Sequence, residues 1–292
     1  MSGPAVRYDG DMTWMRYGLK LSQNATIEQY RDVWRIADEA GFDHCWCMDH
    51  FATLGARDDG AIFEAWTLLG AMAAATSRTR IGCAVTGNTY RHPAALAKAA
   101  VTVDHLSGGR LEFGLGAGWA ENEHTMLGLP FGTAGDRADW LEEACQVVVS
   151  LWTQDRTSFA GTHYQLSGAV AEPKPVQQPH PPIWIGGAGR KRTLRTAARH
   201  ASVWNAPGGS PEQLAELSAV LDRHCAEIGR DPGEIRRSVQ IRVPSSPDET
   251  IALAEAYAEV GVSDILLLLV AGDPVAQAER TAELLPRLRA VT

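Results

Sequence analysis

The stretch GGRLEFGLGAGWAENEH, residues 108–124, places a short apolar run before three alternating glycines, a tryptophan and two carboxylates. Because glycine has no Cβ, the three glycines leave space for a bulky group against the backbone. Glu121 and Glu123 follow within proton-transfer reach of such a group. The pattern predicts the end of a strand at an active site, and it is equally typical of a glycine-rich barrel strand before a helix.

The spacing of these glycines excludes a dinucleotide-binding fingerprint. That fingerprint requires Gly-x-Gly-x-x-Gly between the first strand and its helix. Here the spacing is Gly-x-Gly-x-Gly, and several periodic segments precede it in the chain. The stretch is therefore one strand within a longer series.

That series consists of eight apolar, strand-like runs bounded by turn residues. They lie at residues 16–21, 43–48, 80–86, 111–115, 183–185, 202–205, 238–243 and 264–269. Helical stretches separate them, and the first has Thr26 as its predicted N-cap and Gly41 as its C-cap. Strands that alternate with helices are parallel and joined by right-handed crossovers, and eight units favour closure. We predict an α/β fold of the (β/α)8 TIM-barrel type.

The chain of 292 residues has the length of one such barrel. We expect a single domain at residues 15–292, preceded by a loose extension at 1–14 that lacks the apolar segment of a signal peptide. Residues 157–178 are too long for a connector and too rich in proline for a helix, so they predict an insertion with a short hairpin. The insertion suits a lid over the barrel mouth and a structural flap equally well.

Composition argues against several classes of partner. The net charge of -8 argues against nucleic acid, and no apolar run reaches the ~18 residues of a membrane span. The five cysteines are scattered and odd in number, which predicts reduced thiols in a cytoplasmic enzyme. Glu121 and His124 have a Glu-x-x-His spacing, but the second copy that a di-iron site needs is missing. We therefore expect no metal.

In a TIM barrel the reacting groups lie at the carboxyl ends of the strands. The fifth predicted strand is followed by GGAGRKRT, residues 186–193, a glycine-rich turn directly before a helix. Its N–H groups and the helix dipole attract an anion, so the pattern favours phosphate binding over a merely solvated basic turn. Thr193 would add a hydroxyl. After the second strand, His50 follows Asp49 and suits either proton transfer or a structural role.

Aromatic residues add to this picture of the barrel mouth. Four tryptophans lie within or at the ends of the predicted strands: Trp46, Trp119, Trp184 and Trp204. Their flat apolar surfaces suit a planar ligand, and they equally suit the filling of a barrel. The barrel mouth is thus predicted to combine space beside the glycines, flat aromatic surfaces, an anion site and acid–base groups. This combination favours a phosphorylated tricyclic cofactor over a small polar metabolite.

Five stretches, taken in order, carry a family resemblance. They are WCMDHF at 46–51, TGNTYRHP at 86–93, DHLSGGRLEFGLGAGW at 104–119, EPKPVQ at 172–177 and PPIWIGGAGRKRTL at 181–194. In this combination the chain resembles the bacterial-luciferase-like oxidoreductases, and within them the class that depends on coenzyme F420. The stretches span nearly the whole predicted barrel.

The resemblance implies roles for individual residues. His50, beside Asp49, would face the reactive carbon of the deazaflavin as an acid or base, and Glu121 would be a proton donor. The Ala84–Val85 junction matches a site where relatives carry a non-prolyl cis peptide against the ring. The expected cofactor-binding residues, with Gly187, Ala188 and Gly189 as the phosphate cradle, are Asp49, Ala84, Val85, Thr86, Asn88, Gly118, Trp119, Gly186, Gly187, Ala188, Gly189 and Thr193.

The implied function is F420-dependent transfer of a hydride to or from a small organic substrate. A deazaflavin reacts poorly with oxygen, so this reading predicts a dehydrogenase or reductase. The first alternative is an FMN-dependent monooxygenase supplied with reduced flavin by a separate reductase, and the second is a non-catalytic flavin-binding relative. The basic residues 190–192 suit the acidic oligoglutamate tail of F420 and equally a single phosphate.

Two further properties of the family bear on partners. Relatives that oxidise sugar phosphates use a set of basic pocket residues that has no clear counterpart in this sequence, so substrate identity does not carry over. Relatives commonly dimerise through barrel helices, which makes a homodimer an open expectation here. The sequence does not identify the helix faces that would form it.

Overall fold

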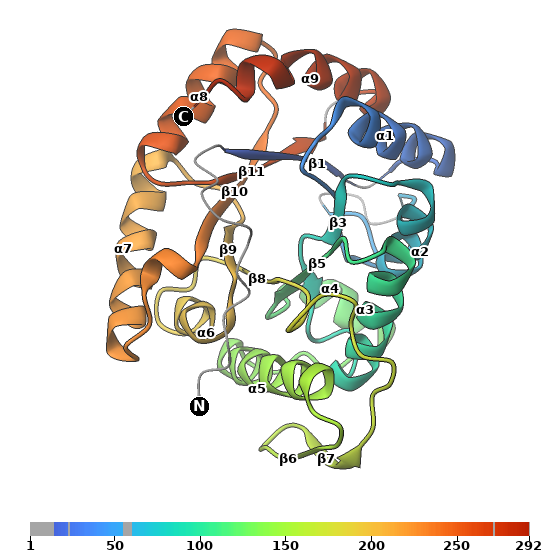
Figure 1. Cartoon of the computed structure of the whole chain (residues 1–292), viewed down its shortest axis with the longest axis vertical. Coiled ribbons are helices and arrows are strands. Elements are labelled where there is room, and N and C mark those ends of the chain that lie inside the picture. Colours follow the sequence, from blue (N-terminus) through green and yellow to red (C-terminus); the bar gives the residue numbers. More distant parts are fainter. Residues whose placement is uncertain (1–14, 23, 55–59, 271, 292) are drawn as a thin grey trace.

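The computed structural model describes residues 15–22, 24–54, 60–270 and 272–291. The expected extension at 1–14 lies outside these ranges. Within them, parallel strands surround a central axis and helices form an outer ring (Figure 1). The closed barrel confirms the predicted (β/α)8 TIM fold.

Hydrogen bonding between neighbouring strands closes the barrel. In spatial order the strands are β3 (Arg80–Cys83), β2 (His44–Cys47), β1 (Arg16–Leu21), β11 (Asp264–Leu269), β10 (Arg236–Arg242), β9 (Val203–Ala206), β8 (Ile183–Gly186), β5 (Leu111–Gly116) and β4 (Thr86–Gly87). β3 also pairs with β5, which closes the sheet. The eight predicted strands are all present, and the third is divided into β3 and β4 at a cis peptide between Ala84 and Val85.

Helices connect successive strands on the outside of the barrel. They are α1 (Ile27–Ala40), α2 (Ala65–Ala75), α3 (Pro93–Ser107), α4 (Glu121–Leu127), α5 (Ala134–Thr153), α6 (Thr193–His200), α7 (Pro211–Glu227), α8 (Pro247–Glu259) and α9 (Pro274–Leu288), with a short 3-10 turn η1 (Pro232–Glu234). α1 begins and ends as predicted: the Thr26 hydroxyl accepts the Gln29 N–H, and Gly41 ends the helix at a φ of 83°. None of the helices in the described ranges is long and apolar enough to cross a membrane.

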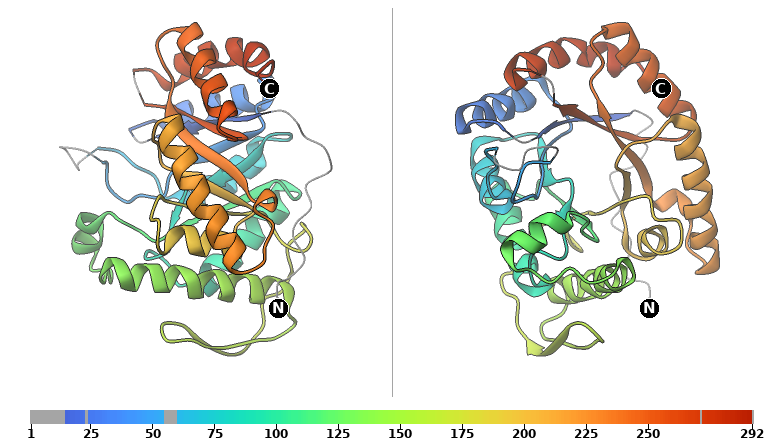
Figure 2. Two further views of the ribbon diagram at one scale, coloured as in Figure 1. Left: turned by 90° about the vertical axis from the view of Figure 1, so that its left-hand side faces the viewer. Right: turned by 180° about the vertical axis from the view of Figure 1, so that it is seen from behind.

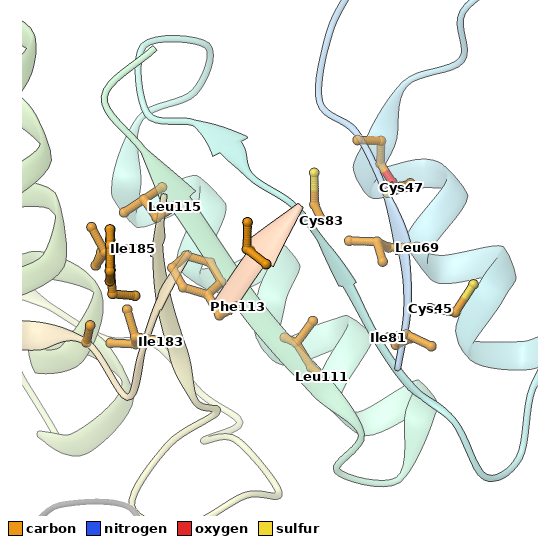
Figure 3. Close-up of a cluster of buried hydrophobic side chains, with 14 of the residues drawn as sticks. Cys45, Cys47, Leu69, Ile81, Cys83, Leu111, Phe113, Leu115, Ile183 and Ile185 are labelled. Atoms are coloured by element: carbon orange, nitrogen blue, oxygen red, sulfur yellow. Dashed lines mark hydrogen bonds between the residues drawn. The ribbon is translucent and has the colours of Figure 1, made fainter. Parts of the chain in front are cut away.

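The main hydrophobic core lies between the strands and this helical ring. Figure 3 shows one part of it, where Ile81 and Cys83 of β3 lie near Leu111 and Phe113 of β5. These side chains are buried because they occupy the outward-facing positions of their strands, under the helices. The five cysteines are buried and free.

The barrel interior is filled in layers. Near the amino ends of the strands lie the charged residues Arg16, Glu112 and Asp264, joined by ion pairs. Above them comes an apolar layer that includes Trp46 and Trp184. Side chains of the protein thus fill the barrel interior below the carboxyl ends of the strands, and the space for a ligand lies at those ends.

The insertion contains the predicted hairpin, formed by β6 (Thr157–Ala160) and β7 (Gln165–Ala169). It lies beside α5 at the edge of the molecule in each view (Figures 1 and 2). The Glu143 carboxylate of α5 accepts the N–H groups of the turn, residues 162–164, at 2.7 to 3.0 Å. The hairpin is thus held against a barrel helix.

Candidate active site

A cavity of about 430 Å³ opens at the carboxyl ends of the strands. Every strand of the barrel except β11 contributes a residue directly or through the loop that follows it. The lining residues are Lys20, Met48, Asp49, His50, Leu54, Ala84, Val85, Thr86, Gly87, Tyr90, Gly116, Ala117, Gly118, Trp119, Gly186, Gly187, Thr193, Asn205, Pro207 and Gln240. Most of the residues proposed from the sequence therefore meet in one pocket.

His50 is held in a defined orientation by Glu123. Its Nδ1 lies 3.0 and 3.1 Å from the two carboxylate oxygens of that residue. The carboxylate also accepts the N–H groups of Phe51 and Ala52, at 3.1 and 3.0 Å, and the hydroxyl of Tyr90. Burial raises the pKa of Glu123, but the hydrogen bonds from Tyr90 and Ala52 outweigh it and hold that pKa below its usual value. An ionised carboxylate only accepts, so Nδ1 carries the hydrogen and Nε2 is left for other chemistry.

The structure brings Glu123, and not Glu121, to His50. Glu121 begins α4 and is exposed, outside the pocket lining, whereas the Glu123 side chain is fully buried. Two positions along a helix are separated by about 200°, so the two carboxylates point in opposite directions. The sequence alone gives both residues a place in the first helical turn and does not fix which one faces inward.

Asp49 anchors the loop after β2. Its carboxylate forms two hydrogen bonds with the Arg91 guanidinium, at 2.6 and 3.0 Å, and accepts the Gly87 N–H at 3.2 Å. This paired geometry is the strong form of an arginine–carboxylate contact. Asp49 lines the pocket as expected, while its charge is already matched by Arg91.

The glycines of β5 and β8 make room for Val85. The cis peptide implied by the family resemblance is present between Ala84 and Val85, and Val85 lines the pocket. A Cβ at either Gly116 or Gly186 would lie 2.7 Å from Val85 Cγ2. The clearance that the sequence predicts for a bulky group is thus used, at these positions, by a side chain of the protein itself.

The turn between β8 and α6 contributes Gly186, Gly187 and Thr193 to the pocket. Gly187 has a φ of 129° and donates its N–H to the Asn205 carbonyl at 3.0 Å, so that N–H is already engaged. Ala188 and Gly189 are exposed and lie outside the lining. Of the three residues expected to form a phosphate cradle, Gly187 lines the pocket, whereas Ala188 and Gly189 do not.

The basic residues of this turn largely face other partners. Arg190 pairs with Glu216 at 2.8 Å, and Arg192 pairs with Asp139. Both arginines thus have carboxylate partners on neighbouring helices. This arrangement weakens the idea that the whole basic cluster serves an acidic tail.

Three of the four tryptophans proposed as ligand walls are fully buried instead. Trp46 and Trp184 fill the barrel interior, whereas Trp204 belongs to the core between the strands and the helices. Trp119 is 65% exposed at the pocket, with its ring centroid 5.5 Å from that of His50. One tryptophan therefore remains available to a ligand.

Two expected cofactor residues have other contacts. Asn88 is buried beside the hairpin, outside the pocket lining, and donates from Nδ2 to the Tyr164 hydroxyl at 3.2 Å. Thr86 lines the pocket, but its hydroxyl accepts the Trp66 indole N–H at 3.2 Å. The hairpin itself supplies no residue to the lining of this pocket.

Sequence reasoning missed the polar floor of the pocket, which consists of Lys20, Asn205 and Gln240. A signal for Lys20 is present in the alternation of β1. Tyr17, Leu19 and Leu21 share the outward face of that strand, which puts Lys20 on the inward face.

The chain was compared with known proteins. The family model of luciferase-like monooxygenases matches residues 12–290. An F420-dependent glucose-6-phosphate dehydrogenase of Microbacterium testaceum is 33% identical over 243 residues, which are 82% of this chain and 71% of that protein. An FMNH2-dependent dimethylsulfone monooxygenase of Pseudomonas putida is 30% identical over 251 residues, 83% of this chain and 68% of that protein.

A solved structure shares the fold. It is that of an F420-dependent secondary alcohol dehydrogenase in complex with an F420-acetone adduct. It superposes with a TM-score of 0.85 over 94% of this chain and 99% of that one, at 21% identity. At this identity the likeness supports the barrel architecture alone.

Proposed function

Because the chain belongs to the luciferase-like monooxygenase family, we propose that it is an oxidoreductase that uses coenzyme F420 to move a hydride to or from a small organic substrate. The relative from Microbacterium testaceum, an F420-dependent dehydrogenase, supports this cofactor. The observation that carries the proposal is the oriented His50–Glu123 pair, because His50 shares one pocket with Thr193, the first residue of α6. The pocket thus combines a proton-transfer group with a place for a phosphate.

The described residues fit a cofactor that has a phosphate and a planar ring. A Cβ at Gly187 would lie 3.1 Å from Thr193 Cγ2, and its φ is one that favours glycine, so glycine keeps the turn before α6 open. At the N-terminus of α6, the Leu194 N–H already donates to the Gly189 carbonyl at 3.0 Å, and the positive end of the helix dipole faces an anion beside Thr193. Val85 and Trp119 supply apolar surface for a ring.

His50 would manage the proton that accompanies the hydride. F420, when bound, supplies a two-electron hydride donor or acceptor that reacts poorly with oxygen. Glu123 keeps the hydrogen of His50 on Nδ1, so that Nε2 can accept a proton from a substrate oxygen or return one to it. Glu123 is a positioning residue in this scheme, and the exposed Glu121 takes no part.

Titration of the purified protein with F420 and with FMN, followed by tryptophan fluorescence, tests the cofactor. Trp119 lies at the pocket and is the expected reporter. Saturable F420 binding with negligible FMN binding supports the proposal. The reverse result contradicts it.

An FMN-dependent monooxygenase is the second candidate, because the relative from Pseudomonas putida uses FMNH2. FMN also carries a phosphate and a planar ring, so the pocket residues named above serve either cofactor. A monooxygenase of this type would need a separate source of reduced flavin. Tight FMN binding in the titration, together with oxygen consumption when reduced FMN is supplied, would favour this candidate.

A further inference from the structure

A directed chain of hydrogen bonds crosses the floor of the pocket. Lys20 Nζ donates to Gln240 Oε1 at 2.6 Å, and Gln240 Nε2 donates to Asn205 Oδ1 at 2.7 Å. Asn205 Nδ2 in turn donates to Ser238 Oγ at 2.8 Å. Each amide therefore turns its oxygen toward Lys20, which fixes the position of the ammonium group.

Lys20 differs from the other cations inside the barrel. Arg16 pairs with Glu112 at 3.4 Å and with Asp264 at 3.1 Å, and both carboxylates are fully buried. Lys20 is only 8% exposed, yet among the described residues its single hydrogen-bond partner is the neutral Gln240. A buried cation normally has an anionic partner.

Asp49 is the acidic residue among those that line the pocket, and its carboxylate is already paired with Arg91. Glu123 lies behind the lining and is held by His50 and Tyr90. Burial lowers the pKa of Lys20 to about 8, so the ammonium form still predominates at pH 7. The pocket thus presents a positive charge with donor capacity left over for a ligand.

The position of Lys20 separates it from the expected phosphate site. In the closed order of the barrel, β8 is four strands from β1 in either direction, so the two strands lie on opposite walls. A phosphate at the turn between β8 and α6 would therefore lie across the pocket from Lys20. The partner of Lys20 has to be another group.

We propose that Lys20, positioned by Gln240 and Asn205, binds a carboxylate of the substrate and so selects small organic acids as the substrate class. The assignment of this carboxylate to a substrate rests on the proposed function, because that function places a cofactor in the same pocket. The carboxylate would take the two ammonium hydrogens that Gln240 leaves unused.

Calorimetric titration with matched pairs of probes tests this assignment. The probes are acetate and benzoate, with the neutral acetamide and benzamide as their isosteres, each added at pH 7 to F420-loaded and to cofactor-free protein. We expect the anions to bind more tightly than the amides. Lys20→Met should weaken binding of the anions about 10- to 100-fold, the size of a charge-assisted hydrogen bond, and leave binding of the amides unchanged.

Two further variants control the experiment. Lys98→Met removes the same charge from an exposed position on α3 and should leave all four affinities unchanged. Lys20→Gln keeps a polar group on the floor and should lose the preference for anions as Lys20→Met does. Circular dichroism of each variant verifies that the barrel is folded.

The outcomes separate this assignment from the proposed function. An absent preference for anions, or one that survives both Lys20 variants, overturns the role of Lys20. The role of Lys20 is also overturned if Lys20→Met loses affinity for F420 and bound F420 prevents the anions from binding. Lys20 would then contact the cofactor and not a substrate. A Lys20-dependent preference in a protein that does not bind F420 upholds the carboxylate site and contradicts the cofactor.

Discussion

The orientation of His50 depends on a carboxylate that the pocket does not expose. Glu123 is fully buried, ionised, and held by two backbone N–H groups and a tyrosine hydroxyl. It can accept but not donate, so it selects one tautomer of the imidazole. The ring nitrogen available for proton transfer is therefore set before any ligand arrives.

Substitution Glu123→Gln should loosen this selection. A glutamine amide both donates and accepts, so either tautomer of His50 can be matched. Ring ¹⁵N shifts of His50 above the titration range of histidine should report the Nδ1–H tautomer in the unmodified chain and a mixture in the variant. Glu121→Gln is the matched control, and an altered tautomer there or an unaltered one in Glu123→Gln would remove Glu123 from its role.

Burial of the Lys20 ammonium group lowers the free energy of unfolding by an amount that depends on pH. Burial lowers its pKa from 10.5 to about 8, so between these values the unfolded chain binds more protons than the folded one. The destabilisation is complete below about pH 8 and disappears as the pH rises toward 10.5. Replacing the lysine removes that dependence.

Urea unfolding of Lys20→Met should show this difference. Relative to the unmodified chain, the variant should gain stability at pH 7, and the gain should shrink between pH 8 and 10. The Cys47 and Cys83 thiols, which lie near Lys20, are present in both proteins. A stability difference that does not vary over this range would show that Lys20 is not held as a buried ammonium.

At the scale of elements, glycines allow close packing between neighbouring strands, because they have no Cβ. The strands concerned are β3, β4, β5 and β8. A Cβ at Gly114 would lie 2.1 Å from the Cys83 carbonyl oxygen, and one at Gly116 would lie 2.7 Å from Val85. Backbone at the first position and a packed side chain at the second leave no room for a methyl group. The glycines therefore specify how the divided third strand lies against its neighbours.

Gly114→Ala should destabilise the barrel by roughly 2 kcal/mol or more, because the clash is with backbone. Gly70 lies inside α2, where an added Cβ would have no described atom within 4 Å apart from its chain neighbours and the adjoining helix backbone, so Gly70→Ala should stabilise the protein by about 0.5–1 kcal/mol. Chemical denaturation measures both. Equal effects at the two positions would contradict this account of the glycines.

The strands were predictable from sequence because each is an apolar run bounded by turn residues, and β1 and β11 agree with the structure at both ends. The face of α4 that turns toward the pocket was not predictable, because it depends on where the helix starts. That start decides whether Glu121 or Glu123 faces His50. Lys20, Asn205 and Gln240 come from β1, β9 and β10, and only the closure of the barrel brings them together. Local patterns carry no information on such contacts.

At the scale of the whole molecule, the amino ends of the strands hold a buried ion-pair network, and the carboxyl ends hold the pocket. Glu112 pairs with Arg16 and Arg80 near the amino ends of the strands and accepts the Trp184 indole N–H at 2.5 Å. Burial raises the pKa of Glu112, but Arg80 and Arg16 outweigh it and hold that pKa below its usual value. This network stabilises the fold, whereas the pocket lies at the opposite end.

Glu112→Gln should therefore lower the free energy of unfolding by roughly 3–5 kcal/mol at pH 7 and leave F420 affinity unchanged in the folded protein. The loss should shrink as the pH falls through the folded-state pKa of Glu112, because the native carboxyl is then protonated as well. Glu39→Gln, which breaks an exposed pair with Arg35, should have a far smaller effect, because water screens the two charges. Comparable losses in the two variants would contradict this division of the barrel.

The most direct test of the central claim is a crystal structure of the chain with F420 bound. We expect the cofactor phosphate at the turn between β8 and α6, within about 3 Å of the Thr193 hydroxyl or the first N–H groups of α6. We expect its ring in the pocket lined by His50, Val85 and Trp119. F420 bound outside this pocket, or with its phosphate on the β1 wall beside Lys20, would contradict the account.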